Sequence, residues 1–167
     1  CGLRVQIGVT TLATRWTIRR LAVAEGLGAD GVQVALPFWL QLREDEATRF
    51  LGEVAAAYPA MPLVLYHTGR AKLKLQPEHL GRLAQQIPSF VGMKDTGCTV
   101  DQLRAMLEAA PDLAIFGGER DLLQKVLAGG HGTYSAVAGL NPWRVAELYE
   151  HAAAGRLETA APLQDAI

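Results

Sequence analysis

Residues 88–97 read Pro88-Ser89-Phe90-Val91-Gly92-Met93-Lys94-Asp95-Thr96-Gly97, so that a lysine directly follows a short apolar run. The pattern predicts a buried strand over residues 90–93, followed by a loop or the start of a helix. Burying a cation is costly, and burial lowers the pKa of an amine and frees its lone pair at neutral pH. An imine-forming lysine needs that property, which an arginine does not offer. Lys94 is therefore a candidate nucleophile; the alternative is a lysine that caps the strand and reaches solvent.

The composition is that of a soluble globular domain. The chain has 167 residues, half of them apolar and a fifth charged, with a net charge of −1. Because the chain has no excess of basic residues, we expect no nucleic-acid partner. No apolar run reaches transmembrane length and no signal peptide is visible, so we expect no membrane association and a cytoplasmic location. Cys1 and Cys98 form no spacing pattern and indicate a reducing setting.

Apolar runs alternate with helical patterns along the whole chain. Strands are predicted over residues 5–9, 31–36, 61–66, 90–93, 113–116 and 133–137. Helices are predicted after Thr14 as an N-cap, over residues 44–58, from Pro77, through residues 103–107, over 122–127 and 143–154, with the start of one more at the end. This alternation predicts a parallel α/β sheet covered on both faces. No Gly-x-Gly-x-x-Gly follows the first strand, which disfavours a dinucleotide-binding fold.

Six strand–helix units fall short of a complete (β/α)8 TIM barrel. That fold has eight units and typically about 250 residues. The chain also begins with Cys1 rather than Met. We therefore expect an excerpt of a TIM barrel that covers about six units, the third to the eighth.

Tyr66 ends the third predicted strand as Lys94 ends the fourth. The two residues are 28 positions apart, and so are Pro62 and Phe90, so the strands superpose unit on unit. Neighbouring strands lie about 4.8 Å apart, and the carboxyl ends of barrel strands face the active site. A tyrosine there could act as acid–base partner of the amine. The alternative is a ring that fills the barrel mouth while its hydroxyl finds any acceptor.

Six motifs occur in the order of a known family. They are residues 5–14, Gly28-Ala29-Asp30-Gly31-Val32, Leu36-Pro37-Phe38-Trp39, Leu63-Val64-Leu65-Tyr66, Val91-Gly92-Met93-Lys94-Asp95, and the pair 117–119 with 130–135. Each is weak alone, but together they span nearly the whole chain. The chain resembles the dihydrodipicolinate synthase / N-acetylneuraminate lyase family, the pyruvate-type class I aldolase barrels.

This resemblance implies a function. Lys94 would form an imine with the ketone carbon of pyruvate or another 2-oxo acid, and Tyr66 would shuttle the proton. The protonated imine would then serve aldol addition, retro-aldol cleavage or dehydration, with no metal or organic cofactor. Gly118 and Tyr134 would line the site. Residues 1–167 would be a partial barrel domain without the first two units and the C-terminal helical extension, and the full-length protein would be a homo-oligomer, a dimer or tetramer.

Several residues depart from the family pattern. Thr10-Thr11 follow the third strand, one unit too late to be the family's carboxylate-binding loop, which we place outside this chain. Trp39 stands where many members have a tyrosine that relays protons to a neighbouring subunit, and an indole N–H cannot relay. His67-Thr68-Gly69-Arg70 replaces the common Asn-Val-Pro-Gly-Arg and is one residue shorter. Arg70 could meet a substrate carboxylate or lie in solvent. We predict that His67 is a hydrogen-bonded strand-end group rather than a base.

Three functions remain open at this point. The first is a lysine-dependent lyase or aldolase acting on 2-oxo acids. The second is a catalytically silent family member that serves as a scaffold or partner subunit. The third is a phosphate-binding barrel enzyme, in which the Gly117-Gly118 and Gly129-Gly130 turns would cradle an anion.

Overall fold

The computed structural model describes residues 2–167 and contains one parallel six-stranded sheet. Its strands are β1 (Gln6–Gly8), β2 (Gly31–Val34), β3 (Leu63–Tyr66), β4 (Phe90–Lys94), β5 (Ala114–Gly117) and β6 (Gly132–Thr133). They pair in sequence order, and every pair is parallel, which confirms the predicted topology. Cys1 lies outside the described residues.

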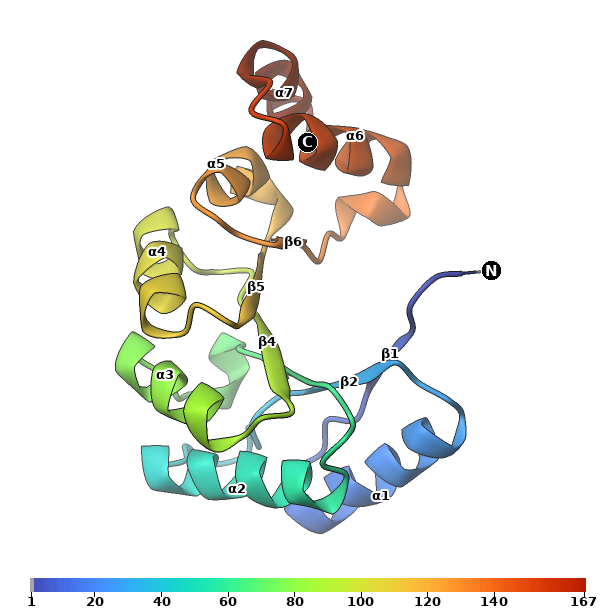
Figure 1. Ribbon diagram of the computed structural model, residues 1–167, viewed down its shortest axis with the longest axis vertical. Helices are drawn as coiled ribbons and strands as arrows, with labels where there is room; N and C mark the ends of the chain where they lie inside the picture. The colour runs from blue at the N-terminus through green and yellow to red at the C-terminus, as the bar shows by residue number, and fades with distance from the viewer. Residues whose placement is uncertain (1) are drawn as a thin grey trace.

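Helices follow the strands and lie along the outer side of the curved sheet (Figure 1). They are α1 (Thr14–Gly26), α2 (Glu44–Ala57), α3 (Pro77–Gln86), α4 (Val100–Ala109), α5 (Leu122–Leu127), α6 (Pro142–Ala153) and α7 (Leu157–Asp165). Short 3-10 turns η1 (Gly69–Ala71), η2 (Glu119–Asp121) and η3 (Val137–Gly139) complete the connections. Among residues 2–167 no helix combines the length and apolarity needed to cross a bilayer.

Local chemistry explains where several helices start. Pro77 is the first residue of α3, a position where its missing N–H and fixed φ cost nothing. The Asn141 side chain accepts a hydrogen bond from the Arg144 N–H and caps α6. At α4, Thr99 and Gln102 form a capping box. These caps satisfy backbone donors that the helices themselves leave unpaired.

Two boundary predictions were wrong. The N-cap of α1 is Ala13, without a side-chain hydrogen bond, and Thr14 is already helical. The hydroxyl of Thr11 serves this turn instead, because it accepts from the Ala13 N–H and bonds the hydroxyl of Thr17. The last strand is only Gly132–Thr133, and residues 137–139 form η3. Its neighbour β5 ends at Gly117, so the chain beyond Thr133 has no further strand partner there.

The register between β3 and β4 contains an irregularity. Leu63 pairs with Phe90, whereas Val64 pairs with Gly92, so Val91 is the additional residue of a bulge. The predicted offset of 28 residues therefore begins at Val64, and Pro62 does not pair with Phe90. From that point the register continues to Tyr66 opposite Lys94. The two candidate site residues are thus direct neighbours at the ends of adjacent strands.

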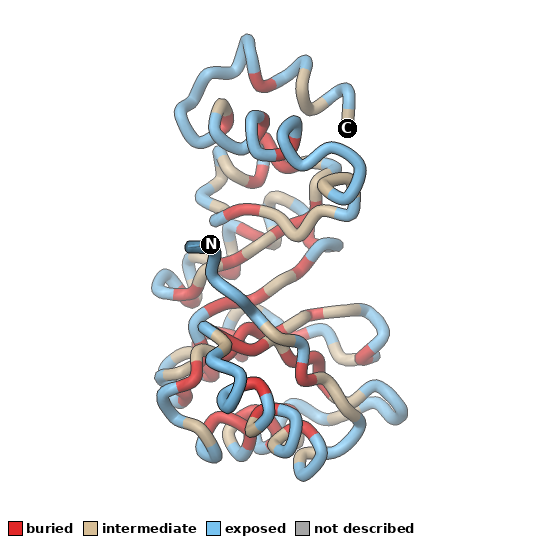
Figure 2. The backbone as a smooth tube through the Cα atoms, turned by 90° about the vertical axis from the view of Figure 1, so that its right-hand side faces the viewer, coloured by how far each residue is buried: buried red, intermediate tan, exposed pale blue. Residues whose placement is uncertain are grey.

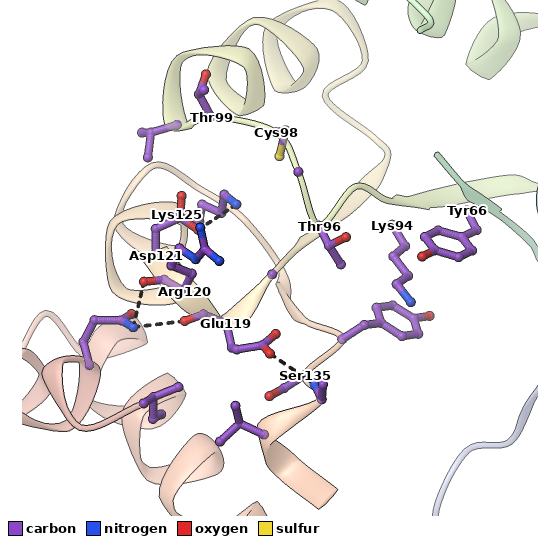
Figure 3. A pocket seen from close by; sticks show the side chains of 18 residues that line it. Tyr66, Lys94, Thr96, Cys98, Thr99, Glu119, Arg120, Asp121, Lys125 and Ser135 are labelled. Atoms are coloured by element: carbon purple, nitrogen blue, oxygen red, sulfur yellow. Dashed lines mark hydrogen bonds and ion pairs between the residues drawn. The ribbon is translucent and has the colours of Figure 1, made fainter. Parts of the chain in front are cut away.

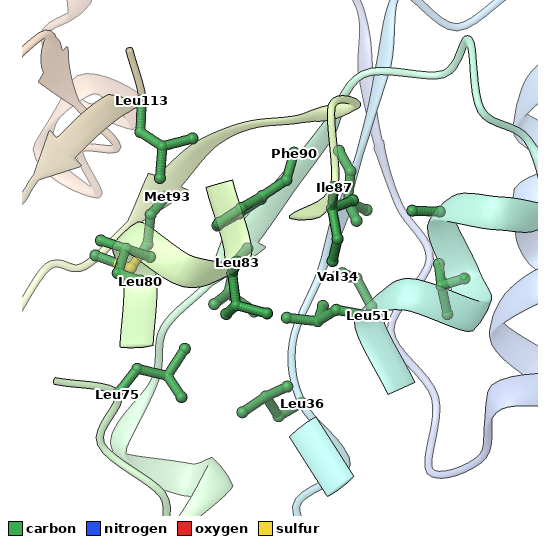
Figure 4. Close-up of a cluster of buried hydrophobic side chains, with 14 of the residues drawn as sticks. Val34, Leu36, Leu51, Leu75, Leu80, Leu83, Ile87, Phe90, Met93 and Leu113 are labelled. Carbon is green, nitrogen blue, oxygen red and sulfur yellow. The ribbon is translucent and has the colours of Figure 1, made fainter. Parts of the chain in front are cut away.

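The buried apolar side chains form two clusters. The larger joins β1 to β5 with α1 to α4. The buried side chains labelled in Figure 4 include Leu36, Leu51, Leu83 and Met93. The smaller joins α5, α6 and α7 through Leu122, Leu123, Val145, Leu148, Ala152 and Ala160. In Figure 2 the buried segments follow the strands and the helix sides that face them. Burying one such leucine is worth about 1.5–3 kcal/mol, so the larger cluster holds the strand ends in place.

Candidate active site

A cavity of about 1270 Å³ lies at the carboxyl ends of β3 to β6. Tyr66 ends β3 and Lys94 ends β4, and both line the cavity. Gly118 and Tyr134, the first residues after β5 and β6, line it as well. Each of these four consecutive strands therefore places a residue at its carboxyl end in the cavity wall, as expected because parallel strands end at the same side of the sheet. The arrangement is shown in Figure 3.

Two aromatic rings flank the amine of Lys94. Its Nζ lies 4.1 Å from the ring centroid of Tyr66 and 4.8 Å from that of Tyr134. Both distances fall in the range of cation–π attraction. Within residues 2–167 no carboxylate forms an ion pair with Lys94, and Lys94 is only partly buried. The side chain is thus held by ring faces while its nitrogen stays open to the cavity.

The ring of Tyr134 is itself fixed from two sides. It packs edge-to-face against Phe116, with ring centroids 5.4 Å apart. Its hydroxyl donates a hydrogen bond of 2.5 Å to Oε1 of Gln6 on β1. This contact joins the loop after the last strand to the first strand of the sheet, and so it keeps the Tyr134 ring over Lys94.

Gly118 allows two cavity-lining turns to touch. A Cβ atom built at this position would lie 2.8 Å from the backbone oxygen of Thr96. Real Cβ atoms do not approach an oxygen so closely, so a larger residue would push the turn after β5 away from the turn after β4. The glycine thereby brings Thr96 and Glu119 into the same cavity wall.

Two of the proposed substrate-binding residues lie elsewhere. Arg70 is exposed in η1 and does not line the cavity. Trp39 is 73% exposed and borders a separate apolar groove with Leu12, Pro37, Leu40 and Leu42. Their roles in binding stay predictions. Thr10 also lies outside the cavity, and its hydroxyl accepts from the Ala35 N–H instead.

The cavity wall contains a buried lysine that was not predicted from the sequence. Lys125 on α5 is 2% exposed, and its Nζ pairs with Oδ1 of Asp121 at 2.7 Å. Its position three residues after the buried Leu122 was the available signal, because that spacing repeats one face of a helix.

Cys98 also lines the cavity. Burial raises the pKa of its thiol, and the nearby Asp95 acts in the same direction. The thiol donates to the backbone oxygen of Asp95 at 3.2 Å. Cys98 is therefore a buried structural thiol rather than a nucleophile.

His67 and Asp95 form a buried pair next to the cavity. Nδ1 of His67 lies 2.6 Å from Oδ2 of Asp95, and Nε2 accepts from the Leu75 N–H at 3.0 Å. Both ring nitrogens are therefore bonded, which confirms His67 as a satisfied strand-end group. Burial alone would raise the pKa of Asp95, but hydrogen bonds from His67 and from the Gly97 N–H outweigh it and lower that pKa. Asp95 is thus an acceptor at neutral pH.

The geometry suits carbonyl chemistry at an amine. A lysine nitrogen open to a cavity, beside a phenol on the neighbouring strand, can attack a carbonyl carbon and exchange protons with that phenol. Within residues 2–167 no group of three or more His, Cys, Asp or Glu side chains could hold a metal ion.

Comparison with known proteins agrees with this geometry. Residues 3–167 match the Dihydrodipicolinate synthetase family. The chain is 33% identical over 159 residues to the 4-hydroxy-tetrahydrodipicolinate synthase of Thermus thermophilus, covering 93% of this chain and 53% of that protein. It is 32% identical over 168 residues to a probable 2-dehydro-3-deoxy-D-pentonate aldolase of Escherichia coli, covering 95% and 54%.

The fold comparison gives the same result. The crystal structure of YagE, a prophage protein of the dihydrodipicolinic acid synthase family from Escherichia coli K12 in complex with pyruvate, superposes with a TM-score of 0.92 at 27% identity. That match covers 98% of this chain and 57% of the other. The chain spans about half the length of the curated relatives it matches and forms part of a TIM barrel. It belongs to the dihydrodipicolinate synthetase family of lyases.

Proposed function

We propose that the protein is a lyase that forms an imine between Lys94 and pyruvate or a related 2-oxo acid. One observation carries the proposal: the register of β3 and β4 puts Tyr66 directly opposite Lys94, with the amine 4.1 Å from the ring centroid in a shared cavity. The pyruvate bound to the similar YagE structure supports the substrate class.

The chemistry follows from these groups. The Lys94 nitrogen attacks the ketone carbon, and the resulting carbinolamine loses water when its hydroxyl takes up a proton. Tyr66 first passes a proton from the attacking nitrogen to the former carbonyl oxygen, and it then protonates the hydroxyl that leaves as water. The products are a protonated imine and a deprotonated Tyr66, which can take up the proton of the C–H bond that breaks next. The protonated imine then accepts the electron pair of a C–H or C–C bond next to it. Addition of the resulting enamine to a second carbonyl gives aldol synthesis, and the reverse gives cleavage.

The direct test is reductive trapping on the full-length protein. Borohydride added with pyruvate, or with each of several other 2-oxo acids, should leave a stable adduct on the peptide that contains Lys94. Lys125 is the internal control, because it lines the same cavity but is paired with Asp121 and should stay unmodified. Absence of a reduced adduct on Lys94 with every 2-oxo acid would contradict the proposal.

A catalytically silent scaffold is the second candidate. Arg70 is exposed outside the cavity, and Trp39 cannot relay protons, so two of the proposed contacts are absent from the cavity wall. The trapping experiment decides between the two, because a silent member would leave Lys94 free of adduct. For either function we expect a homo-oligomer of the full-length protein, which light scattering after size exclusion measures.

A further inference from the structure

The residues that directly follow the two site residues meet on the opposite face of the sheet. Successive side chains of a strand point to opposite faces. The register that places Tyr66 opposite Lys94 therefore also places His67 beside Asp95, behind the cavity. Both side chains are buried, at 8% and 6% exposure, and neither lines the large cavity.

The hydrogen bonds define the state of the histidine. Nε2 accepts from the Leu75 N–H and so carries no proton, which leaves the proton on Nδ1, where it is donated to Asp95. The second oxygen of Asp95 accepts from the Gly97 N–H at 3.0 Å. The pair thus joins the loop after β3, from His67 to Leu75, to the turn after β4.

Backbone hydrogen bonds tie His67 to β4 and Asp95 to β5. The His67 N–H donates to the Lys94 oxygen at 2.8 Å, and the Asp95 N–H donates to the Phe116 oxygen at 2.9 Å. In contrast, no hydrogen bond joins the side chains of Tyr66 and Lys94 within the described residues. The His67–Asp95 hydrogen bond is therefore the side-chain contact nearest to Tyr66 and Lys94 that can fix the relative position of the ends of β3 and β4.

We propose that His67 is a positioning residue, which holds Tyr66 against Lys94 through its hydrogen bond to Asp95. The expected effect of His67 on the trapping rate rests on the proposed function of Lys94. His67 is not the general base, because both of its nitrogens are occupied and it lies on the other face of the sheet.

Three substitutions separate the two bonds of the imidazole. In His67→Asn the amide nitrogen lies near the place of Nδ1 and can still donate to Asp95, but the bond from Leu75 is lost. In His67→Gln the amide oxygen lies near the place of Nε2 and can still accept from Leu75, but the donor to Asp95 is lost. His67→Phe removes both bonds and keeps a ring of similar size.

The first readout is the rate of borohydride trapping of full-length protein as a function of pyruvate concentration. His67→Gln and His67→Phe should lower the limiting rate by about 10- to 100-fold, because small misplacements of reacting groups have effects of that size. The half-saturating pyruvate concentration should change by less than about threefold. His67→Asn should trap within about threefold of the wild type, a rescue by the residue that keeps the bond to Asp95.

The second readout does not need an imine. Reductive methylation places 13C-methyl groups on the Lys94 nitrogen, which lies over the Tyr66 ring, so ring current should shift their proton resonance upfield. Lys94→Arg identifies that signal. We expect the upfield shift to persist in His67→Asn and to fall by at least half in His67→Gln and His67→Phe.

The matched control is His79→Phe. His79 is a second buried histidine, bonded to the hydroxyl of Thr48 in a groove between α2 and α3, so its loss tests for a general effect of removing a buried imidazole. It should leave the trapping rate and the Lys94 methyl shift unchanged.

Two results would overturn the inference. One is a folded His67→Gln protein whose trapping rate and Lys94 methyl shift equal those of the wild type. This variant alone decides the question if His67→Phe does not fold. The other is equal slowing in His67→Asn and His67→Gln, which would remove the special role of the Asp95 bond. If the wild type itself does not trap, the proposed function fails, while the methyl shift still decides on positioning.

Discussion

The ends of β3 and β4 present two different faces. On the cavity face, Tyr66 and Lys94 share no hydrogen bond within the described residues, and the amine is held by ring faces at 4.1 and 4.8 Å. On the outer face, His67 and Asp95 are buried, and each polar atom of the two side chains is hydrogen-bonded. One register creates both pairs.

From this difference we expect the cavity-face pair, Tyr66 and Lys94, to serve the reaction and the outer-face pair, His67 and Asp95, to stabilise the fold. Groups on the cavity face keep their hydrogen-bonding capacity free for a ligand, and their loss should remove reactivity with little effect on stability. On the outer face, every hydrogen-bonding group of His67 and Asp95 is bonded to another part of the chain, so the loss of either side chain should reduce stability. The four predictions that follow test this contrast.

Lys94→Arg on the cavity face should have the largest effect. Arginine keeps the positive charge and the attraction to the flanking rings, but it stays protonated and cannot attack a carbonyl. We expect complete loss of borohydride trapping by the full-length protein and a melting temperature close to that of the wild type. Trapping on another residue, or a large drop in melting temperature, would contradict this division of roles.

Tyr66→Phe should slow imine formation without abolishing it. The ring that flanks the Lys94 nitrogen remains, while the hydroxyl that we propose to transfer protons is lost. General acid–base help is worth about 10²–10⁴-fold, so the trapping rate at saturating pyruvate should fall by a factor in that range. An unchanged rate would show that another group carries the proton.

Asp95→Ala on the outer face should chiefly reduce stability. It leaves the buried His67 Nδ1–H without its acceptor and also removes the acceptor of the Gly97 N–H. An unsatisfied buried polar group costs about 1–3 kcal/mol, and urea denaturation should show a loss of that size in the free energy of unfolding. Asp101→Ala is the control: its side chain is 92% exposed, so its loss should change the same quantity by less than about 1 kcal/mol. Equal effects of the two substitutions would refute the contrast.

His79 is a second buried histidine, and it differs from His67 because one of its ring nitrogens has no hydrogen-bond partner among residues 2–167. Its Nε2 bonds Thr48, whereas Nδ1 has no hydrogen-bond partner among residues 2–167 and only faces Glu44 at 3.4 Å. Burial lowers the pKa of His79; Glu44 opposes this and Arg82 adds to it. The unfolded chain therefore takes up a proton as the pH falls through about 6.5, while the folded protein does not.

The free energy of unfolding should consequently decline as the pH falls below that value, until the folded histidine is protonated too. His79→Gln should make the decline shallower, since it removes this difference in proton uptake. Urea denaturation at a series of pH values between neutrality and pH 5 measures both slopes. This is the smallest of the four expected effects, and identical slopes would contradict it.

Particular elements show how far sequence reasoning reached. The six strands, their parallel order and the strand-end place of Lys94 followed from apolar runs and turn residues, which are local signals. The bulge at Val91 was not predicted, because nothing in a short apolar run indicates which residue will lack a partner. Burial of Lys125 was missed because the partner surface of α5 is not visible in its own sequence.

The candidate site divides in the same way. The sequence by itself determined the candidate residues for the proposed chemistry, since a lysine and a tyrosine at the ends of apolar runs can be recognised from residue type and spacing. Only the tertiary structure decided that the Tyr134 ring covers Lys94 while bonded to Gln6, that Arg70 lies outside the cavity wall, and that His67 meets Asp95. Those outcomes depend on contacts between segments far apart along the chain, and such contacts are set by the packing of the whole sheet rather than by any local pattern of residues.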